Sequence, residues 1–222
     1  MNTYTLHGYF RSSTSWRVRI ALGFKGVSYE TVPVHLLRDG GQQHSESYRE
    51  LNPVGEVPTL EVRGPDGALV ARLAQSVAIL EYLEETHPEP PLLPTDPVQR
   101  AKTRQLVEVV NSSIHPVQNL KVMRQLTADF GTDRAANFDW ARRWIDRHFV
   151  GLERLVTATR GRFALGDDLS LADVAIVPQV FNARRFGVDM ERFPNLSAVD
   201  AAAGEHPAFQ AAVPALQPDF EG

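Results

Sequence analysis

The sequence predicts an α/β domain at the N-terminal end of the chain and an all-α domain after it. Short β-like runs alternate with helical patterns over the first third of the 222 residues, a proline-rich stretch follows, and helical periodicity fills the remainder. The order expected for the first part is β-α-β-α-β-β-α. The expected boundaries are residues 1–86 for this domain, 87–97 for a linker and 98–222 for the helical domain.

Each element of the first domain has its own local signal. Alternation or β-rich composition marks the strands, apolar residues at helical spacing mark the helices, and Gly64-Pro65-Asp66-Gly67 is a strong hairpin turn. In chain order we expect a strand at Thr3–Tyr9, a helix at Ser15–Lys25, a strand at 29–34, a helix at Ser45–Leu51, strands at 58–62 and 68–71, and a helix at Ser76–Thr86.

The remainder of the chain is predicted to be helical. The linker holds five of the fifteen prolines in eleven residues, too many for a helix or a central strand. Two apolar faces follow at helical spacing, and His115-Pro116 is expected to bend the first of them. Ser170 and Asp173 have the spacing of a capping box. The apolar positions are Leu106, Val107, Val110 and Ile114, then Ile145, Phe149, Leu152 and Val156.

Composition excludes several classes of function. Lys and Arg number 23 against 27 Asp and Glu, so the net charge of −4 gives no basic field for nucleic acid or an anionic membrane. The absence of cysteine excludes disulfides, cysteine-ligated metals and a cysteine nucleophile. The seven histidines lack metal-binding spacing, and no dinucleotide, P-loop or serine-hydrolase motif is present. With no signal-peptide pattern or long apolar run, we expect a cytoplasmic protein.

Four hydroxyl residues, at positions 12–15, stand between the first strand and the first helix. One of them can simply cap the helix. Alternatively, a helix N-terminus with surplus hydroxyls forms a site for an anion or a thiolate. Arg17 and Arg19 follow on the same helix about 200° apart, so we expect separate surface or interface charges rather than one basic patch.

Three other short motifs have both a structural and a functional interpretation. Val57-Pro58 begins a strand, and a cis bond there would turn the backbone of Val57 outward to pair with an extended peptide. Gln75-Ser76 begins a helix and is either a cap or a carboxylate cradle. Arg184-Arg185 near a helix end is most simply a solvated pair.

Taken in order, these motifs resemble the glutathione S-transferase superfamily and specifically its zeta class. Tyr9–Leu22 resembles the signature S-S-C-x-W-R-V-R-I-A-L, and the resemblance extends over essentially the whole chain. The further matching segments are Asp39–Gln43, Leu51–Pro53, Val57–Leu60, Gln75-Ser76 and His115–Leu120.

The resemblance implies a thioredoxin-like N-terminal domain that binds glutathione and an all-helical domain that supplies the second substrate's pocket. Ser13 is then the hydroxyl that bonds the glutathione sulfur, flanked by Ser12 and Thr14, with Arg11 and Arg185 receiving the substrate's carboxylates. The other glutathione-binding or active-site residues implied are Gln43, Val57, Pro58, Gln75, Ser76, His115, Gln118 and Asn119.

Thr14 departs from the signature, which has cysteine at this position. Threonine keeps a hydrogen-bonding group but cannot form a mixed disulfide, so activities that need that cysteine are in doubt. The resemblance implies a homodimer and a glutathione-dependent cis–trans isomerase of maleylacetoacetate, with maleylpyruvate as the alternative substrate. The other hypotheses are a conjugating transferase or dehalogenase of small α-halo acids and a non-catalytic assembly module of the same fold.

Overall fold

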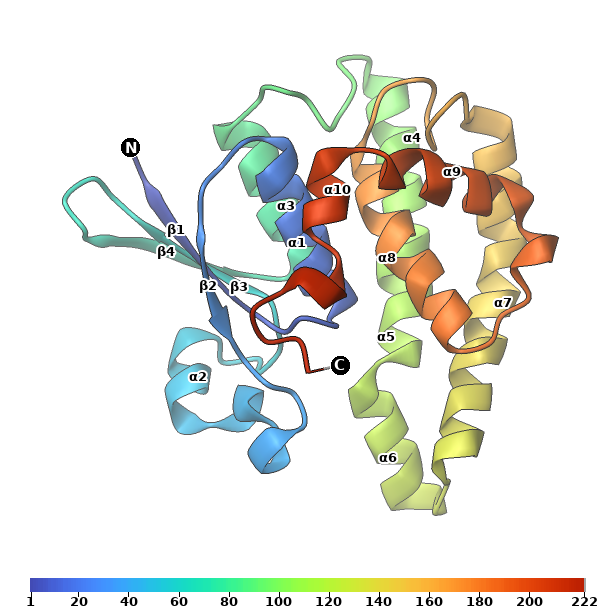
Figure 1. Ribbon diagram of the computed structural model, residues 1–222, viewed down its shortest axis with the longest axis horizontal. Helices are drawn as coiled ribbons and strands as arrows, with labels where there is room; N and C mark the ends of the chain where they lie inside the picture. Colours follow the sequence, from blue (N-terminus) through green and yellow to red (C-terminus); the bar gives the residue numbers. More distant parts are fainter. Residues whose placement is uncertain (222) are drawn as a thin grey trace. The chain divides into compact units, whose positions relative to one another are not determined.

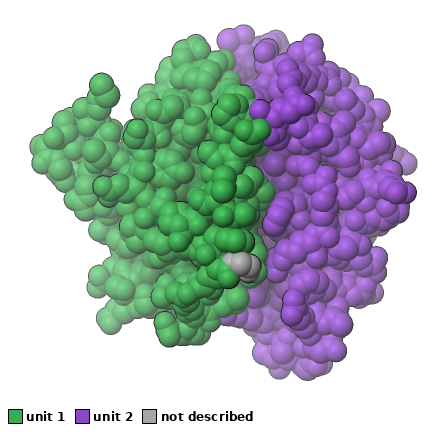
Figure 2. Space-filling model, viewed as in Figure 1, with its two compact units in different colours: residues 1–91, 206–222 green, residues 92–205 purple. Residues whose placement is uncertain are grey.

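The computed structural model describes residues 1–221, which form two compact units (Figure 2). The first unit comprises residues 1–91 and the C-terminal segment from residue 206, and the second comprises residues 92–205. The predicted linker contains the division between Pro91 and Leu92. The segment from residue 206 follows the helical part in the sequence but belongs to the first unit by its contacts.

The first unit is built on a four-stranded mixed sheet with the order β2-β1-β3-β4 (Figure 1). β1 and β2 are parallel, and the other two pairs are antiparallel. This is the thioredoxin-like arrangement expected. Its elements are β1 (Thr3–Gly8), α1 (Ser13–Phe24), β2 (Glu30–Pro33), α2 (Glu46–Leu51), β3 (Thr59–Arg63), β4 (Leu69–Ala74), α3 (Ser76–Thr86) and α10 (Pro207–Ala211).

Helix α1 is buried along most of its length. It packs against α3 and against α10, which the chain reaches only after the whole second unit. Val18, Ile20, Ala21 and Leu22 have no exposed surface although they point to different sides of the helix. The helix begins at Ser13, two residues before the predicted Ser15, because the Oγ of the residue before it caps the helix.

The second unit is all-helical, as predicted. Both predicted apolar faces are buried, and all four positions of the second face have no exposed surface. The predicted capping box is present at Ser170. The helices are α4 (Pro97–Glu108), α5 (His115–Gln118), α6 (Leu120–Phe130), α7 (Arg134–Thr159), α8 (Leu171–Arg185) and α9 (Pro194–Gly204), with a π-helical segment at Val109–Ile114 between the first two.

Candidate active site

The hydroxyl run lies at the N-terminus of α1. Ser12 is the N-cap residue, and its Oγ accepts from the backbone N–H of Ser15 over 3.2 Å. Ser13 is the first helical residue and is buried. The unpaired N–H groups of a first helical turn and the helix dipole favour a negative charge at this position.

Two of the three candidate hydroxyls already have their protons committed. Thr14 Oγ1 donates to the backbone carbonyl of Val57 over 3.1 Å. Thr14 Oγ1 and Ser12 Oγ are 2.9 Å apart, so Ser12 is the donor in that bond because Thr14 has only one proton. Among the described residues the Ser13 hydroxyl has no hydrogen-bond partner, so its proton is the one available to a ligand.

Val57 is brought to the start of α1 by a fixed loop. The Val57–Pro58 bond is cis, the isomer that the functional interpretation of this motif required. The preceding loop is held by Asn52, whose Nδ2 donates to the Glu56 carbonyl over 2.7 Å, and by Tyr48, whose hydroxyl donates to the same carbonyl over 2.8 Å. Val57 is half-buried, and its carbonyl lies beside the hydroxyl run, within hydrogen-bond distance of Thr14.

Gln75 and Ser76 form the start of α3, and a buried arginine lies behind them. Arg17 has no exposed surface, and its Nη1 donates to Ser76 Oγ over 3.2 Å. Because that oxygen accepts from a guanidinium, its own hydrogen is free to point outward to a carboxylate. Gln75 has φ 71° and ψ 113°, a left-handed conformation that costs a non-glycine residue about 1–3 kcal/mol and is commonest at functional sites.

Gln43 is buried in the loop after β2. Its Nε2 lies 3.0 Å from Nε2 of His44, and its Oε1 is a buried acceptor without a partner in the described part of the chain. Gly41 leaves room for the Gln43 side chain, because a Cβ at position 41 would come within 2.6 Å of Gln43 Nε2. The φ of +112° at Gly41 also disfavours any residue other than glycine. A buried carbonyl without a donor is a ready acceptor for a ligand N–H.

Arg11 is half-buried beside the aromatic residues that precede it. Its guanidinium carbon lies 5.9 Å from the centre of the Tyr9 ring and 5.6 Å from that of Phe10. These contacts are within the range of cation–π attraction. Arg11 directly precedes the hydroxyl run in the sequence, and its contacts with the two rings hold its guanidinium in place.

Three further candidates lie around α5 in the second unit. Gln118 is buried and exchanges two hydrogen bonds, of 2.9 and 3.0 Å, with the buried side chain of Gln179 on α8. Asn119 Oδ1 accepts from the Lys121 N–H at the start of α6. His115 is half-buried and follows the π-helical segment, a kind of distortion that is frequent at functional sites.

Arg184 and Arg185, the two arginines at the end of α8, lie in different environments. Arg184 forms an ion pair with Asp200 over 2.5 Å. The Arg185 guanidinium lies over two rings, 5.7 Å from the centre of Phe138 and 5.0 Å from that of Phe186. Arg185 is exposed, and these rings restrict its guanidinium to one side of the helix end.

The structure thus brings Ser12, Ser13, Thr14, Val57 and Pro58 together within the first unit, and Arg17 connects α1 with the start of α3. His115, Gln118, Asn119 and Arg185 belong to the second unit. The expectation that Arg17 and Arg19 are surface or interface charges was wrong. Both are buried inside the first unit, because α1 is covered by α3 and α10.

Sequence reasoning missed several supporting residues. Tyr48 and Asn52 gave no signal beyond a helix and a turn, and His35 gave none. For Arg17 and Arg19 the sequence did contain a signal of burial. The other residues around them are apolar on all sides of the predicted helix, and this pattern is typical of a buried helix. In the described part of the chain no group of three or more potential metal ligands occurs, and no helix has the length and apolarity to cross a membrane.

The class of protein defined by these features is the glutathione S-transferase. They are a mixed thioredoxin-like sheet, a cis-proline loop that faces a hydroxyl-rich helix start, and an all-helical second unit. Residues 6–91 match the family model for the N-terminal domain of that superfamily. The chain belongs to its zeta class, the family of maleylacetoacetate and maleylpyruvate isomerases, because it matches members of both kinds over nearly its whole length.

The maleylacetoacetate isomerase of Dictyostelium discoideum is 47% identical over 99% of this chain and 97% of its own length. The maleylpyruvate isomerase of a Ralstonia species is 46% identical over 96% and 98%. A solved maleylacetoacetate isomerase from Anaeromyxobacter dehalogenans 2CP-1, with GSH in its active site, superposes with a TM-score of 0.90 at 46% identity over 99% of both chains.

Proposed function

We propose that this protein is a glutathione-dependent cis–trans isomerase that converts maleylacetoacetate to fumarylacetoacetate. The observation that carries the proposal concerns the three candidate hydroxyls at the start of α1: Ser12 and Thr14 donate their protons to other residues, whereas Ser13 has no hydrogen-bond partner among the described residues. A donor at this position stabilises a thiolate. Glutathione then acts as a cofactor that is regenerated in every cycle.

The first unit supplies the glutathione site. Ser13 donates to the sulfur, and the backbone N–H and carbonyl of Val57, oriented by Pro58, pair with the tripeptide backbone. The Ser76 hydroxyl and the first amides of α3, next to Gln75, hold the γ-glutamyl carboxylate. Gln43 Oε1 accepts from a peptide N–H of the ligand, which satisfies its buried carbonyl.

Ser12 and Thr14 support this site without bonding the sulfur themselves. Ser12 Oγ caps the helix, and the donation from Thr14 to the Val57 carbonyl fixes the loop against α1. That carbonyl has a second lone pair for a ligand N–H. The isomerisation needs no protein thiol, so threonine in place of the family's cysteine is compatible with it.

The second unit supplies additional contacts. We assign His115 and Asn119 to glutathione or the active site, and Arg185 to a substrate carboxylate. Gln118 belongs to this set through its reciprocal bonds with Gln179, which connect the segment after the π-helix to the helix that ends in Arg185.

The chemistry balances without metal or nucleotide. The thiolate adds to one carbon of the cis double bond, and the electron pair moves into the conjugated carbonyl to give an enolate. The former double bond is now single and rotates. Collapse of the enolate expels the thiolate and leaves the trans isomer. Arg11 and Arg185 suit the carboxylates because a guanidinium donates two parallel hydrogen bonds to each.

A ligand found on a relative agrees with this scheme. The Anaeromyxobacter isomerase has also been solved with dicarboxyethyl glutathione and citrate in its active site, at a TM-score of 0.88 and 44% identity to this chain. By its name the first compound is glutathione that carries a two-carbon group with two carboxylates, and the adduct proposed here is likewise glutathione that carries a dicarboxylate.

The test has two steps, glutathione-agarose binding and an isomerase assay. We expect retention on the resin and a glutathione-dependent loss of maleylacetoacetate absorbance, with proton NMR identifying the trans product. Maleylpyruvate is assayed in parallel and decides between the two substrates. Halide release from an α-halo acid without isomerisation would instead favour a dehalogenase or transferase, and failure of both steps would favour an assembly module.

We further propose a homodimer, as in the superfamily. Leu69 and Val70 on the edge strand β4 are apolar residues that are 45% and 60% exposed, respectively. Light scattering should give about twice the 24.7 kDa mass of the chain. A mass near that of one chain at every concentration would contradict the proposal.

A further inference from the structure

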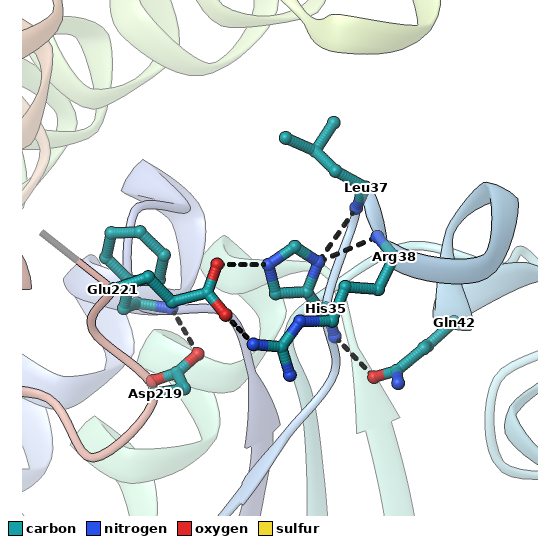
Figure 3. A network of polar contacts seen from close by, with 7 residues as sticks. His35, Leu37, Arg38, Gln42, Asp219 and Glu221 are labelled. Carbon is teal, nitrogen blue, oxygen red and sulfur yellow. Dashed lines mark hydrogen bonds and ion pairs between the residues drawn. The ribbon is translucent and has the colours of Figure 1, made fainter.

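The C-terminal segment Ala212–Glu221, here called the C-terminal strap, lies against two loops of the candidate site within the first unit (Figure 3). The backbone N–H of Phe10 donates to Oδ2 of Asp219 over 2.9 Å. The rings of Phe10 and Phe220 meet edge to face with centroids 5.5 Å apart. The strap therefore contacts the residue that directly precedes Arg11.

The buried Arg19 completes the attachment of that loop. Its guanidinium donates to the carbonyls of Tyr9 over 3.4 Å and Phe10 over 2.9 Å, and to the carbonyl of Ala212 in the strap over 3.2 Å. Both backbone polar groups of Phe10 are thus bonded to the strap or to an arginine shared with it. The position of Arg11 depends on these bonds, since its peptide unit continues from Phe10.

His35 connects the strap to the second loop. Its Nδ1 accepts from the backbone N–H groups of Leu37 over 3.1 Å and Arg38 over 2.8 Å. A nitrogen that accepts carries no proton, so the ring proton is on Nε2, which donates to the Glu221 carboxylate over 3.2 Å. Arg38 also forms an ion pair with Glu221.

The backbone of His35 closes the same loop. Its N–H donates to Oε1 of Gln42 over 2.8 Å, and its carbonyl accepts from the Gln42 N–H over 2.8 Å. The next residue is Gln43, the buried side chain with an unsatisfied Oε1. The His35 ring thus lies between the strap and the turn that presents Gln43.

We propose that the C-terminal strap positions the glutathione site for catalysis and that His35 is the positioning residue through which it holds loop 35–43. The proposal rests on the proposed function, because it takes Arg11 and Gln43 to be substrate and glutathione contacts. It adds that two residues near the end of the chain, Asp219 and Glu221, belong to the supporting structure of this site.

The arrangement requires a neutral imidazole. In protonated His35, Nδ1 would carry a hydrogen that points at the backbone N–H groups of Leu37 and Arg38. Both hydrogen bonds that close the loop would then be lost. The surroundings favour the neutral form, because burial lowers the pKa of His35 and Arg38 lowers it further. The charged groups around the ring are Arg38, Asp219, Arg11, Asp39 and Glu221, and the Tyr9 ring packs edge to face against it.

The sign of the pH effect follows from this preference. An unfolded or open loop takes up a proton near the ordinary histidine pKa of about 6.5, whereas the closed loop resists it to lower pH. Closure is therefore fully favoured above about pH 6.5 and is lost as the pH falls toward the depressed pKa. Glutathione affinity should weaken over the same range.

Two variants test the strap, a chain that ends at Pro218 and His35→Asn. Asparagine retains an acceptor near the position of Nδ1 but has neither the proton that reaches Glu221 nor a titratable ring. His148→Asn, in the second unit, is the matched control. Hydrogen exchange needs no ligand, and in both test variants we expect faster exchange of the amides of Leu37, Arg38 and Gln42 than in the control.

Calorimetry with glutathione then measures the effect on the site. The truncated chain should bind glutathione about tenfold more weakly at pH 7.5, the size expected when one hydrogen bond to the ligand, that of Gln43, is no longer held in position. Wild-type affinity should fall between pH 7.5 and 5.5, and His35→Asn should reduce that dependence. Unchanged exchange and affinity in both variants would overturn the proposal.

The outcomes separate this proposal from the proposed function. If the wild-type chain bound no glutathione, the function would fail while the exchange data would still report on the strap. If glutathione bound equally well at both pH values and in every variant, the strap proposal alone would fail. Should the truncated chain not fold, Glu221→Gln tests the contacts of Glu221 with His35 and Arg38 in a chain that retains Asp219.

Discussion

Ser13→Ala should separate thiolate stabilisation from glutathione binding. Among Ser12, Ser13 and Thr14, only the Ser13 proton is not donated to another described residue, and the substitution removes it. The proposed peptide and γ-glutamyl contacts lie elsewhere. A hydrogen bond to a charged group is worth about 1.5–3 kcal/mol, so turnover at neutral pH should fall roughly 10- to 150-fold. The KM for glutathione should change little.

The same free energy predicts how far the pKa of the bound glutathione thiol should shift in Ser13→Ala. At about 1.4 kcal/mol per unit, the loss should raise the pKa of the bound glutathione thiol by about 1–2. Ultraviolet difference titration of the thiolate measures this pKa directly, and the pH–rate profile should move to higher pH by the same amount. Part of the lost activity should therefore return in alkaline buffer.

Ser12→Ala and Thr14→Val are the controls, and each has its own expected signature. Ser12→Ala removes a helix cap, which costs about 1 kcal/mol of stability and lowers the melting temperature. Thr14→Val releases the Val57 carbonyl and should act mainly on the glutathione KM. A wild-type thiol pKa and rate in Ser13→Ala, with a shifted pKa in either control, would refute the assignment of Ser13.

Four other substitutions test different parts of the chain. Arg11→Lys and Arg185→Lys should each raise KM for the dicarboxylate with glutathione affinity near wild type, since an ammonium lacks the fork geometry; steady-state kinetics would contradict this if both KM values stayed unchanged. Arg17→Met should raise the glutathione KM about tenfold with little change in kcat, because Ser76 loses its donor. Burial raises the pKa of Asp173 to about 6, so its contribution to unfolding free energy falls as the pH rises from about 4 to about 6. Asp173→Asn should remove that slope in urea titrations, although it also lowers the midpoint.

Local sequence signals were sufficient for most of the elements. The helix at Ser76–Thr86 has the predicted bounds, and the Gly64–Gly67 turn joins β3 and β4 as expected. The start of α1 was misplaced by two residues because four consecutive hydroxyl residues are all acceptable N-caps. Only the three-dimensional structure shows that Ser12 accepts the capping bond.

The site was predicted as a set of residues but not as a network. The sequence indicated that Ser12, Ser13, Thr14 and Val57 belong to one site. No local pattern could show that Thr14 donates to a carbonyl 43 residues away. Which hydroxyl remains free depends on that long-range bond. The strap is a still more distant case, since it contacts Phe10 across 209 residues.

The two buried arginines of α1 show why the sequence-based expectation failed and what the geometry accomplishes. Positions 17 and 19 are about 200° apart on a helix, which correctly excludes one basic patch. Burial on opposite sides gives them different partners instead. Arg17 bonds Ser76 at the start of α3, whereas Arg19 bonds the carbonyls of Phe10 and Ala212. The helix that presents Ser13 therefore also fixes the proposed carboxylate cradle on one side and the loop that carries Arg11 on the other.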